Sequence, residues 1–213
     1  MVELGKKILV SIADQKLLLL QDKIKIAEYP ISTSKFGIGN KSGSKMTPLG
    51  YHIIKEKVGD NVPQNSIYKD DNFTKEIAVI DYKKIDEDDL ITSRVMKLVG
   101  LESGINKGGE VDSFERGIWI HGTVAECDIG SPASHGCIRM KNEDIIKLYN
   151  MVDIGVSVEI KMELIEKVQD MHKQTTKRQH SFRLANRREK GVFDNALWKL
   201  GGKERRKKER RKN

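Results

Sequence analysis

Short apolar runs separated by turn residues are the feature of this sequence that most constrains its fold. Ile8, Val10 and Ile12 alternate with smaller or polar residues, and a second apolar run at 17–20 follows a turn-like polar segment. An alternation with a period of two buries one face of an extended segment, and two such runs joined by a short polar segment predict a β-hairpin. Residues 24–33 continue the pattern after another reversal. The first third of the chain therefore predicts a β-meander in a mostly-β fold.

A helix and a closing strand are predicted after residue 140. Asn142 is a candidate N-cap, and Glu143 and Asp144 suit the positive end of a helix whose apolar face comes from residues 145–149. Residues 156–160 then alternate as a strand. We expect one or two short helices beside the sheet.

Polar and glycine-rich stretches predict the loops. Residues 37–45 are rich in Gly, Ser and Lys, but their glycine spacing is not that of a phosphate-binding loop, so we interpret them as a surface or cleft-edge loop. Residues 83–89 are polar and acidic and predict a loop that leads into a short strand or turn at 91–101. Residues 102–112 contain three glycines and predict a second flexible loop.

Charge divides the chain into two parts. Residues 161–213 carry 18 Lys and Arg against 7 Asp and Glu, a net charge of +11, so the formal +8 of the whole chain leaves residues 1–160 at −3. The first part is long enough for one substantial core, whereas the second is too charged to build another. We expect a folded domain at 1–160 and a basic extension at 161–213, helical in part and disordered at its end.

The basic extension leaves three interpretations open. Its last stretch, 203–212, has eight basic and two acidic side chains, which predicts a segment that does not pack. The extension can be a solubilising tail, or bind an anionic membrane or wall polymer, or bind nucleic acid, which is the least favoured of the three.

Two histidines and a cysteine carry the chemistry of the sequence. A thiol with a pKa of ~8.5 is mostly protonated at neutral pH and needs a base to become a nucleophile. His121 ends an alternating run typical of a strand, and His135 precedes Cys137 by two residues, which puts both on one face of an extended backbone. Gly122 and Gly136 allow close backbone approach, and the N–H of Gly136 or Cys137 can donate to an oxyanion.

Other interpretations of these residues stay open. Cys127 and Cys137 with two histidines could hold zinc, but the spacing lacks the paired motifs of structural zinc sites, so we expect no metal. Cys137 could also be a buried core thiol. We interpret Cys127 as a bystander, with a regulatory disulfide to Cys137 as the alternative.

Several segments together carry a family resemblance. The pattern His-Gly-Thr at 121–123, followed by Ser-His-Gly-Cys-Ile-Arg at 134–139, resembles the active-site signature of the L,D-transpeptidases, bacterial enzymes that cross-link or anchor to peptidoglycan through a cysteine. Other segments resemble the family in the family's order: Val10–Ile12 with Gln15–Leu17, Tyr29–Ser34, Thr47–Gly50, Thr92–Arg94 and Arg116–Ile120. The resemblance, to the YkuD type, covers about residues 6–160.

The resemblance implies a β-sandwich catalytic domain that needs no cofactor. Cys137 would attack the carbonyl at the third residue of a peptidoglycan stem tetrapeptide and expel D-Ala to form a thioester. His121 would be the base, the Gly122 carbonyl would orient its imidazole, and His135 would shape the loop, with a second-choice role as base. An acceptor amine would then resolve the thioester.

Four further residues are candidates for binding substrate. The resemblance implies that Arg139 grips a substrate carboxylate and that Ser134 hydrogen-bonds within residues 134–137, here called the cysteine loop. Thr123 and Arg116 complete the set.

Four residues outside the two signature segments keep two interpretations each. Arg94, Glu102 and the candidate Arg116 either line the cleft or are surface charges or ion pairs. Trp119 fits the core better than a substrate platform.

The sequence leaves the acceptor and the setting open. Another stem peptide would give a 3→3 cross-link, a wall protein would be anchored, and water would give L,D-carboxypeptidase activity; a non-catalytic peptidoglycan-binding module is a further alternative. We expect a monomer whose partners are peptidoglycan stem peptides. The family implies the cell envelope or periplasm, although residues 1–21 show no clear signal sequence and no stretch is long enough to span a bilayer.

Overall fold

The computed structural model describes residues 5–69, 72–80 and 89–163, and this part of the chain is mostly β. The elements are β1 (Lys6–Ser11), β2 (Lys16–Gln21), β3 (Ile24–Ser32), β4 (Gly50–Val58), β5 (Ser66–Lys69), β6 (Asn72–Ile77), β7 (Ile91–Gly100), β8 (Trp119–Thr123), β9 (Ile138–Met140), helix α1 (Asn142–Met151), β10 (Ser157–Lys161) and the 3₁₀ turns η1 (Gly109–Val111) and η2 (Glu126–Asp128). The predicted fold class, a mostly-β domain with a short helix, is confirmed.

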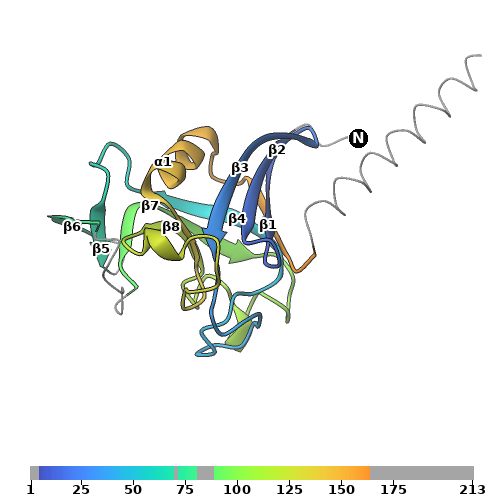
Figure 1. The fold of residues 1–213 in the computed structure, drawn as a ribbon. Coiled ribbons are helices and arrows are strands. Elements are labelled where there is room, and N and C mark those ends of the chain that lie inside the picture. Colours follow the sequence, from blue (N-terminus) through green and yellow to red (C-terminus); the bar gives the residue numbers. More distant parts are fainter. Residues whose placement is uncertain (1–4, 70–71, 81–88, 164–213) are drawn as a thin grey trace, which may run out of the picture. The chain divides into compact units, whose positions relative to one another are not determined.

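The strands form one hydrogen-bonded sheet that closes on itself (Figure 1). Its order is β4-β10-β1-β2-β3-β9-β8-β7-β5-β6, and β4 also pairs with β7, so eight strands form a ring from which the β5–β6 hairpin extends. Among these strands, only the pairs β1–β10 and β8–β9 are parallel. The β8–β9 pair positions the candidate site.

One apolar cluster fills the fold, and every strand of the ring contributes to it. Ile8 and Val10 of β1 are fully buried in this cluster. Leu9 and Ser11 are buried too, so the alternation expected there does not separate a buried face from an exposed one. Ile120 of β8 and Ile138 of β9 bury their side chains in the same cluster, and helix α1 adds Ile145 and the neighbouring apolar residues of its inner face. The two strands that carry the candidate site are therefore anchored by their core-facing residues.

Helix α1 begins differently from the prediction. Asn142 is the first helical residue and Lys141 holds the cap position, without a side-chain cap hydrogen bond. The Asn142 side chain instead accepts hydrogen bonds from the hydroxyls of Thr92 and Ser93, each at 2.6 Å. The carboxylate of Glu126 accepts the Asn142 backbone N–H at 2.8 Å and so satisfies the helix start. The predicted N-cap role of Asn142 is wrong, because its side chain joins the helix to β7.

Strand β7 is longer than the sequence indicated. Residues 91–101 were expected to form a short strand or turn, whereas β7 is ten residues long and pairs with β4, β5 and β8. Its ladder with β8 shifts register between Thr92 and Val95, where Ser93 has a positive φ of 64°. This bulge therefore lies opposite Gly122 and His121 of the candidate site.

The remaining predictions divide between confirmed loops and residues that the structure does not describe. Residues 37–45 contain no strand, and 102–112 contain no strand and no helix other than the 3₁₀ turn η1, with an isolated bridge between Ser103 and Lys107. The expectations for 83–88 and for the basic extension from residue 164 onward lie outside the described residues. Within the described ranges, no helix has the length and hydropathy needed to cross a bilayer.

Candidate active site

The β8–β9 ladder places His121 and Cys137 on one face of the sheet. Ile120 pairs with Ile138 and His121 with Arg139, and Cys137 immediately precedes β9. Because Ile120 and Ile138 point into the core, the odd-numbered neighbours face the other way. With strands ~4.8 Å apart and a rise of ~3.3 Å per residue, the Cα atoms of His121 and Cys137 lie about 8 Å apart, within reach of an imidazole and a thiol.

The imidazole of His121 is held in one tautomer. Its Nδ1 lies 2.8 Å from the backbone carbonyl oxygen of Gly122, which can only accept, so Nδ1 donates and Nε2 is left as the acceptor. Nε2 is buried and has no hydrogen-bond partner among the described residues. Burial lowers the pKa of His121 against the opposing effect of the Asp89 carboxylate. His121 is therefore a neutral base with an open acceptor.

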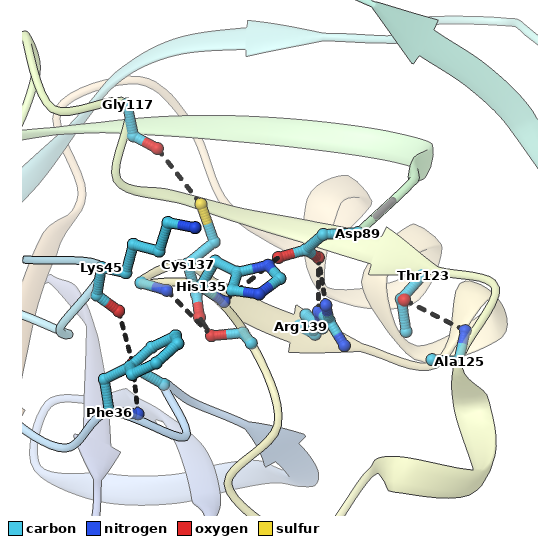
Figure 2. A network of polar contacts seen from close by, with 12 residues as sticks. Phe36, Lys45, Asp89, Gly117, Thr123, Ala125, His135, Cys137 and Arg139 are labelled. Carbon is cyan, nitrogen blue, oxygen red and sulfur yellow. Dashed lines mark hydrogen bonds and ion pairs between the residues drawn. The ribbon is translucent and has the colours of Figure 1, made fainter. Parts of the chain in front are cut away.

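The thiol of Cys137 is protonated in this structure. Its Sγ donates to the Gly117 carbonyl oxygen at 3.1 Å (Figure 2). Burial raises the pKa of the Cys137 thiol to about 12, although the Trp119 backbone N–H and the guanidinium groups of Arg139 and Arg116 oppose the rise. Nucleophilic chemistry at Cys137 thus needs a base at the moment of reaction.

Asp89 joins the cysteine loop to β9, and the sequence analysis missed it. Its carboxylate accepts the His135 backbone N–H at 3.1 Å, contacts His135 Nδ1 at 3.0 Å and accepts Arg139 Nε at 2.6 Å (Figure 2). Burial alone would raise the pKa of the Asp89 carboxyl, but the nearby His121 imidazole, the Arg139 guanidinium and the His135 N–H outweigh it and hold this pKa below its usual value. Asp89 is therefore an ionised clamp on the loop.

Hydrogen bonds within the loop fix the backbone on either side of Cys137. The Ser134 hydroxyl donates to the Cys137 carbonyl at 2.6 Å and accepts the Gly136 N–H at 3.2 Å. Gly136 has φ 126°, a conformation that L side chains rarely adopt. Since the Gly136 N–H is already used, the Cys137 N–H, for which the described residues offer no partner, is the better donor for an oxyanion.

Arg116 brings a second cation to the thiol. Its Nη2 donates to the Met46 carbonyl at 2.7 Å, and its Nη1 is buried without a partner among the described residues. Its charge and Cys137 interact electrostatically. Arg116 therefore holds residues 44–46 through Ser44 and Met46, and its charge makes this side of the thiol positive.

Comparison with known proteins identifies the fold that carries this geometry. Residues 5–160 match the family model described as the L,D-transpeptidase catalytic domain, YkuD. The chain belongs to the L,D-transpeptidase family.

Relatives of known sequence match a short stretch of the chain. It is 50% identical over 40 residues to the probable L,D-transpeptidase YbiS of Escherichia coli K12, and 49% identical over 41 residues to the probable L,D-transpeptidase ErfK/SrfK of Salmonella typhimurium. Each match covers 19% of this chain and 13% of the relative, a small part of the relatives' length.

Solved L,D-transpeptidase structures match a longer part of the chain at low identity. L,D-transpeptidase 3 of Mycobacterium tuberculosis, in complex with a faropenem-derived adduct, is 19% identical with a TM-score of 0.45, over 74% of this chain and 60% of that protein chain. A mutant L,D-transpeptidase of Enterococcus faecium is 15% identical with a TM-score of 0.45, over 74% and 50%.

Two of the predicted substrate-binding residues are internal. Arg139 is 2% exposed and its guanidinium is paired with Asp89, so it is not free to grip a substrate carboxylate as predicted. Thr123 is fully buried, and its hydroxyl accepts the Ala125 N–H at 3.1 Å. By the alternation along β8 and β9, both side chains lie on the same sheet face as His121 and Cys137, and their partners there are other residues of the protein.

The other candidate site residues have definite partners. His135 stacks on the Phe36 ring at 5.8 Å between centroids, in addition to its contacts with Asp89. Ser134 is fully buried and bonds within the loop, as described above. Cys127 and Cys137 are both free, and no cluster of three or more His, Cys, Asp or Glu able to hold a metal occurs in the described ranges.

Arg94, Glu102 and Trp119, for which the sequence left two interpretations, have definite surroundings in the structure. Arg94 is 8% exposed and donates to the Ser93 carbonyl, and the Glu102 carboxylate accepts the Tyr51 backbone N–H. Trp119 is half-buried, with the Lys97 ammonium 5.6 Å from its ring centroid. None of the contacts found for Arg94 or Glu102 in the described part of the chain involves Cys137 or His121.

Proposed function

We propose that this domain is a cysteine-dependent acyltransferase that acts on peptidoglycan stem tetrapeptides. The observation that carries the proposal is the state of His121, whose Nδ1 is held by the Gly122 carbonyl while its buried Nε2 has no partner among the described residues. An unpaired buried acceptor is costly, so it needs a reason. An open acceptor on the same sheet face as the Cys137 thiol is what a general base for that thiol requires.

The first half-reaction forms a thioester on Cys137. The thiol leaves the Gly117 carbonyl and gives its proton to His121 Nε2, while the sulfur attacks the carbonyl carbon of the third stem residue. The Cys137 N–H donates to the oxyanion that forms. His121 returns the proton to the nitrogen of D-Ala as the C–N bond breaks, so D-Ala leaves as a free amine and His121 is neutral again.

The second half-reaction transfers the acyl group. An acceptor amine attacks the thioester carbon and gives its proton to His121. The C–S bond then breaks, and His121 passes that proton to the sulfur, which restores the Cys137 thiol. A stem-peptide amine gives a 3→3 cross-link and a wall-protein amine gives an anchored protein, whereas water gives L,D-carboxypeptidase activity. Both the donor and the product belong to the peptidoglycan layer, which supports a place in the cell envelope.

The test uses diaminopimelate-containing disaccharide tetrapeptides and mass spectrometry of the products. We expect the wild type to release D-Ala and to form a dimer or a tripeptide, and Cys137→Ala and His121→Ala to release none. Cys127→Ala is the matched control, because Cys127 is exposed and outside the site, and should keep wild-type activity. Release of D-Ala by Cys137→Ala would refute the role of Cys137 as nucleophile. An inert wild type that still binds the tetrapeptide would replace the proposal by a non-catalytic wall-binding role.

A further inference from the structure

Residues 34–47, here called the Lys45 loop, form a wall directly beside the cysteine loop. The Lys35 N–H donates to the Ser134 carbonyl at 3.1 Å, and the Thr47 hydroxyl donates to the Gly136 carbonyl at 2.9 Å. A Cβ built on Gly136 would lie 3.5 Å from the Met46 carbonyl oxygen and 3.7 Å from the Lys45 carbonyl carbon. The two loops are therefore packed backbone to backbone next to Cys137.

The backbone of Lys45 is held on both sides in an uncommon conformation. Its φ is 58°, in the left-handed region that residues other than glycine seldom occupy. The Ser34 hydroxyl donates to the Lys45 carbonyl, and the Arg116 guanidinium holds the carbonyl of the next residue, Met46, at 2.7 Å. Figure 2 shows the Lys45 side chain extending from this position toward the Cys137 sulfur. A strained residue whose side chain faces a reactive group invites a functional explanation.

The charges around the thiol single out Lys45. Arg139 is neutralised by Asp89 within the fold. Lys45 is exposed and forms no ion pair with any described residue, so its ammonium remains available to an anion that enters the site. Arg116, on the same side of Cys137, likewise lacks a carboxylate partner among the described residues. This side of the site is suited to an anionic part of the substrate.

We propose that Lys45 binds the terminal carboxylate of the residue that leaves when the thioester forms. The inference rests on the proposed function and adds its donor specificity. In a tetrapeptide the departing nitrogen is bonded to the Cα that bears the carboxylate, so that charge lies close to the attacked carbonyl and hence to Cys137. A donor that is amidated there, or extended by a further residue, offers no charge at this place. Lys45 thus selects donors in which the scissile bond is the last one.

The first test measures how strongly the positive charge of Lys45 favours an anionic reagent at Cys137, and it needs no enzymatic activity. Iodoacetate and iodoacetamide both alkylate a thiolate with loss of iodide, but only iodoacetate carries a carboxylate. Both rate constants at Cys137 are proportional to the fraction of thiolate, so their ratio does not depend on that fraction. All measurements use the Cys127→Ala variant, in which Cys137 is the one remaining thiol. For two unit charges in contact through water, at a separation of ~4 Å, the interaction changes such a ratio roughly fivefold.

We expect Lys45→Met to lower the iodoacetate-to-iodoacetamide ratio about fivefold at low ionic strength, and Lys45→Arg to restore it. Lys41→Met is the matched control, since Lys41 is an exposed lysine of the same loop, and it should leave the ratio unchanged. An unchanged ratio in Lys45→Met, or an equal fall in Lys41→Met, would overturn the proposal.

The second test compares the tetrapeptide with its C-terminal amide as donors. The wild type should prefer the acid, and Lys45→Met should lose that preference through a higher KM for the acid while the amide is used as before. Equal preference in the wild type and Lys45→Met overturns the assignment. If the wild type turns over neither donor, the proposed function fails, and the alkylation ratio still decides the role of Lys45.

Discussion

Replacing Asp89 by Asn is expected to lower the free energy of unfolding by about 3 kcal/mol, because it leaves a buried guanidinium without its counter-ion. Arg139 is 2% exposed and the Asp89 side chain 17% exposed, so water replaces the lost carboxylate poorly. Removing one partner of a buried ion pair costs ~3–5 kcal/mol. The lower end applies here, since Asn keeps an oxygen that can accept the His135 N–H.

Urea unfolding at pH 7, followed by circular dichroism, measures this loss. Thermal unfolding gives a second measure: in a domain of this size a loss of 1 kcal/mol lowers Tm by ~2–4 °C, so Tm should fall by roughly 10 °C. The control is the double variant Asp89→Asn with Arg139→Met. If the penalty comes from the unpaired guanidinium, the double variant recovers to within ~1 kcal/mol of the wild type.

Two results would refute this reasoning. A loss below ~1 kcal/mol in Asp89→Asn would mean that Arg139 finds other partners or reaches solvent. A double variant as unstable as Asp89→Asn alone would mean that the carboxylate acts through His135 and not through the ion pair.

Three further predictions concern pH and space. Burial lowers the pKa of His52 from 6.5 to about 4, so the unfolded chain binds the proton first and stability should fall by about 3 kcal/mol as the pH drops through that window; urea unfolding of wild type and His52→Gln at pH 7 and 4.5 should show a smaller loss in the variant. With a Cys137 pKa raised to about 12, iodoacetamide alkylation in the Cys127→Ala background should rise about tenfold per pH unit between pH 7 and 10, and a plateau below pH 9 would contradict a neutral resting thiol. Gly122→Ala would place a Cβ 2.6 Å from the Thr92 carbonyl oxygen and should cost ~2 kcal/mol or more in urea unfolding, whereas Gly5→Ala, which meets nothing within 4 Å, should cost far less.

Elements with a strong local pattern could be predicted from the sequence. Strands β1, β2 and β10 and helix α1 each carry an apolar periodicity within a few residues, and the structure forms them at the expected places. His121 and Cys137 could also be singled out as candidates from the local sequence, because each lies at the edge of a short apolar run. Their position on one sheet face follows from the β8–β9 register.

Features that depend on distant residues could not be predicted in this way. Strand β4 interleaves charged and apolar residues and is recognisable only by its partners β10 and β7. Asp89 is the last residue of an acidic stretch, and nothing in the local sequence distinguishes its carboxylate from the others. Its contacts with His135 and Arg139, 46 and 50 residues away in the sequence, set it apart. Asn142 has the composition of an N-cap, but Thr92 and Ser93 compete for its side chain from 50 and 49 residues away in the sequence.

Strand β10 lies between β1 and β4 in the ring, although it is the last of the described strands to be synthesised. It pairs with residues 7–11 of β1 on one side and with 50–53 of β4 on the other. A nascent chain therefore carries unpaired edges on β1 and β4 until residue 161 has left the ribosome. The ring closes only when β10 pairs with both strands, which are far from it in the sequence. Translation arrest or proteolytic cleavage before residue 157 would leave both edges open to strands of other molecules.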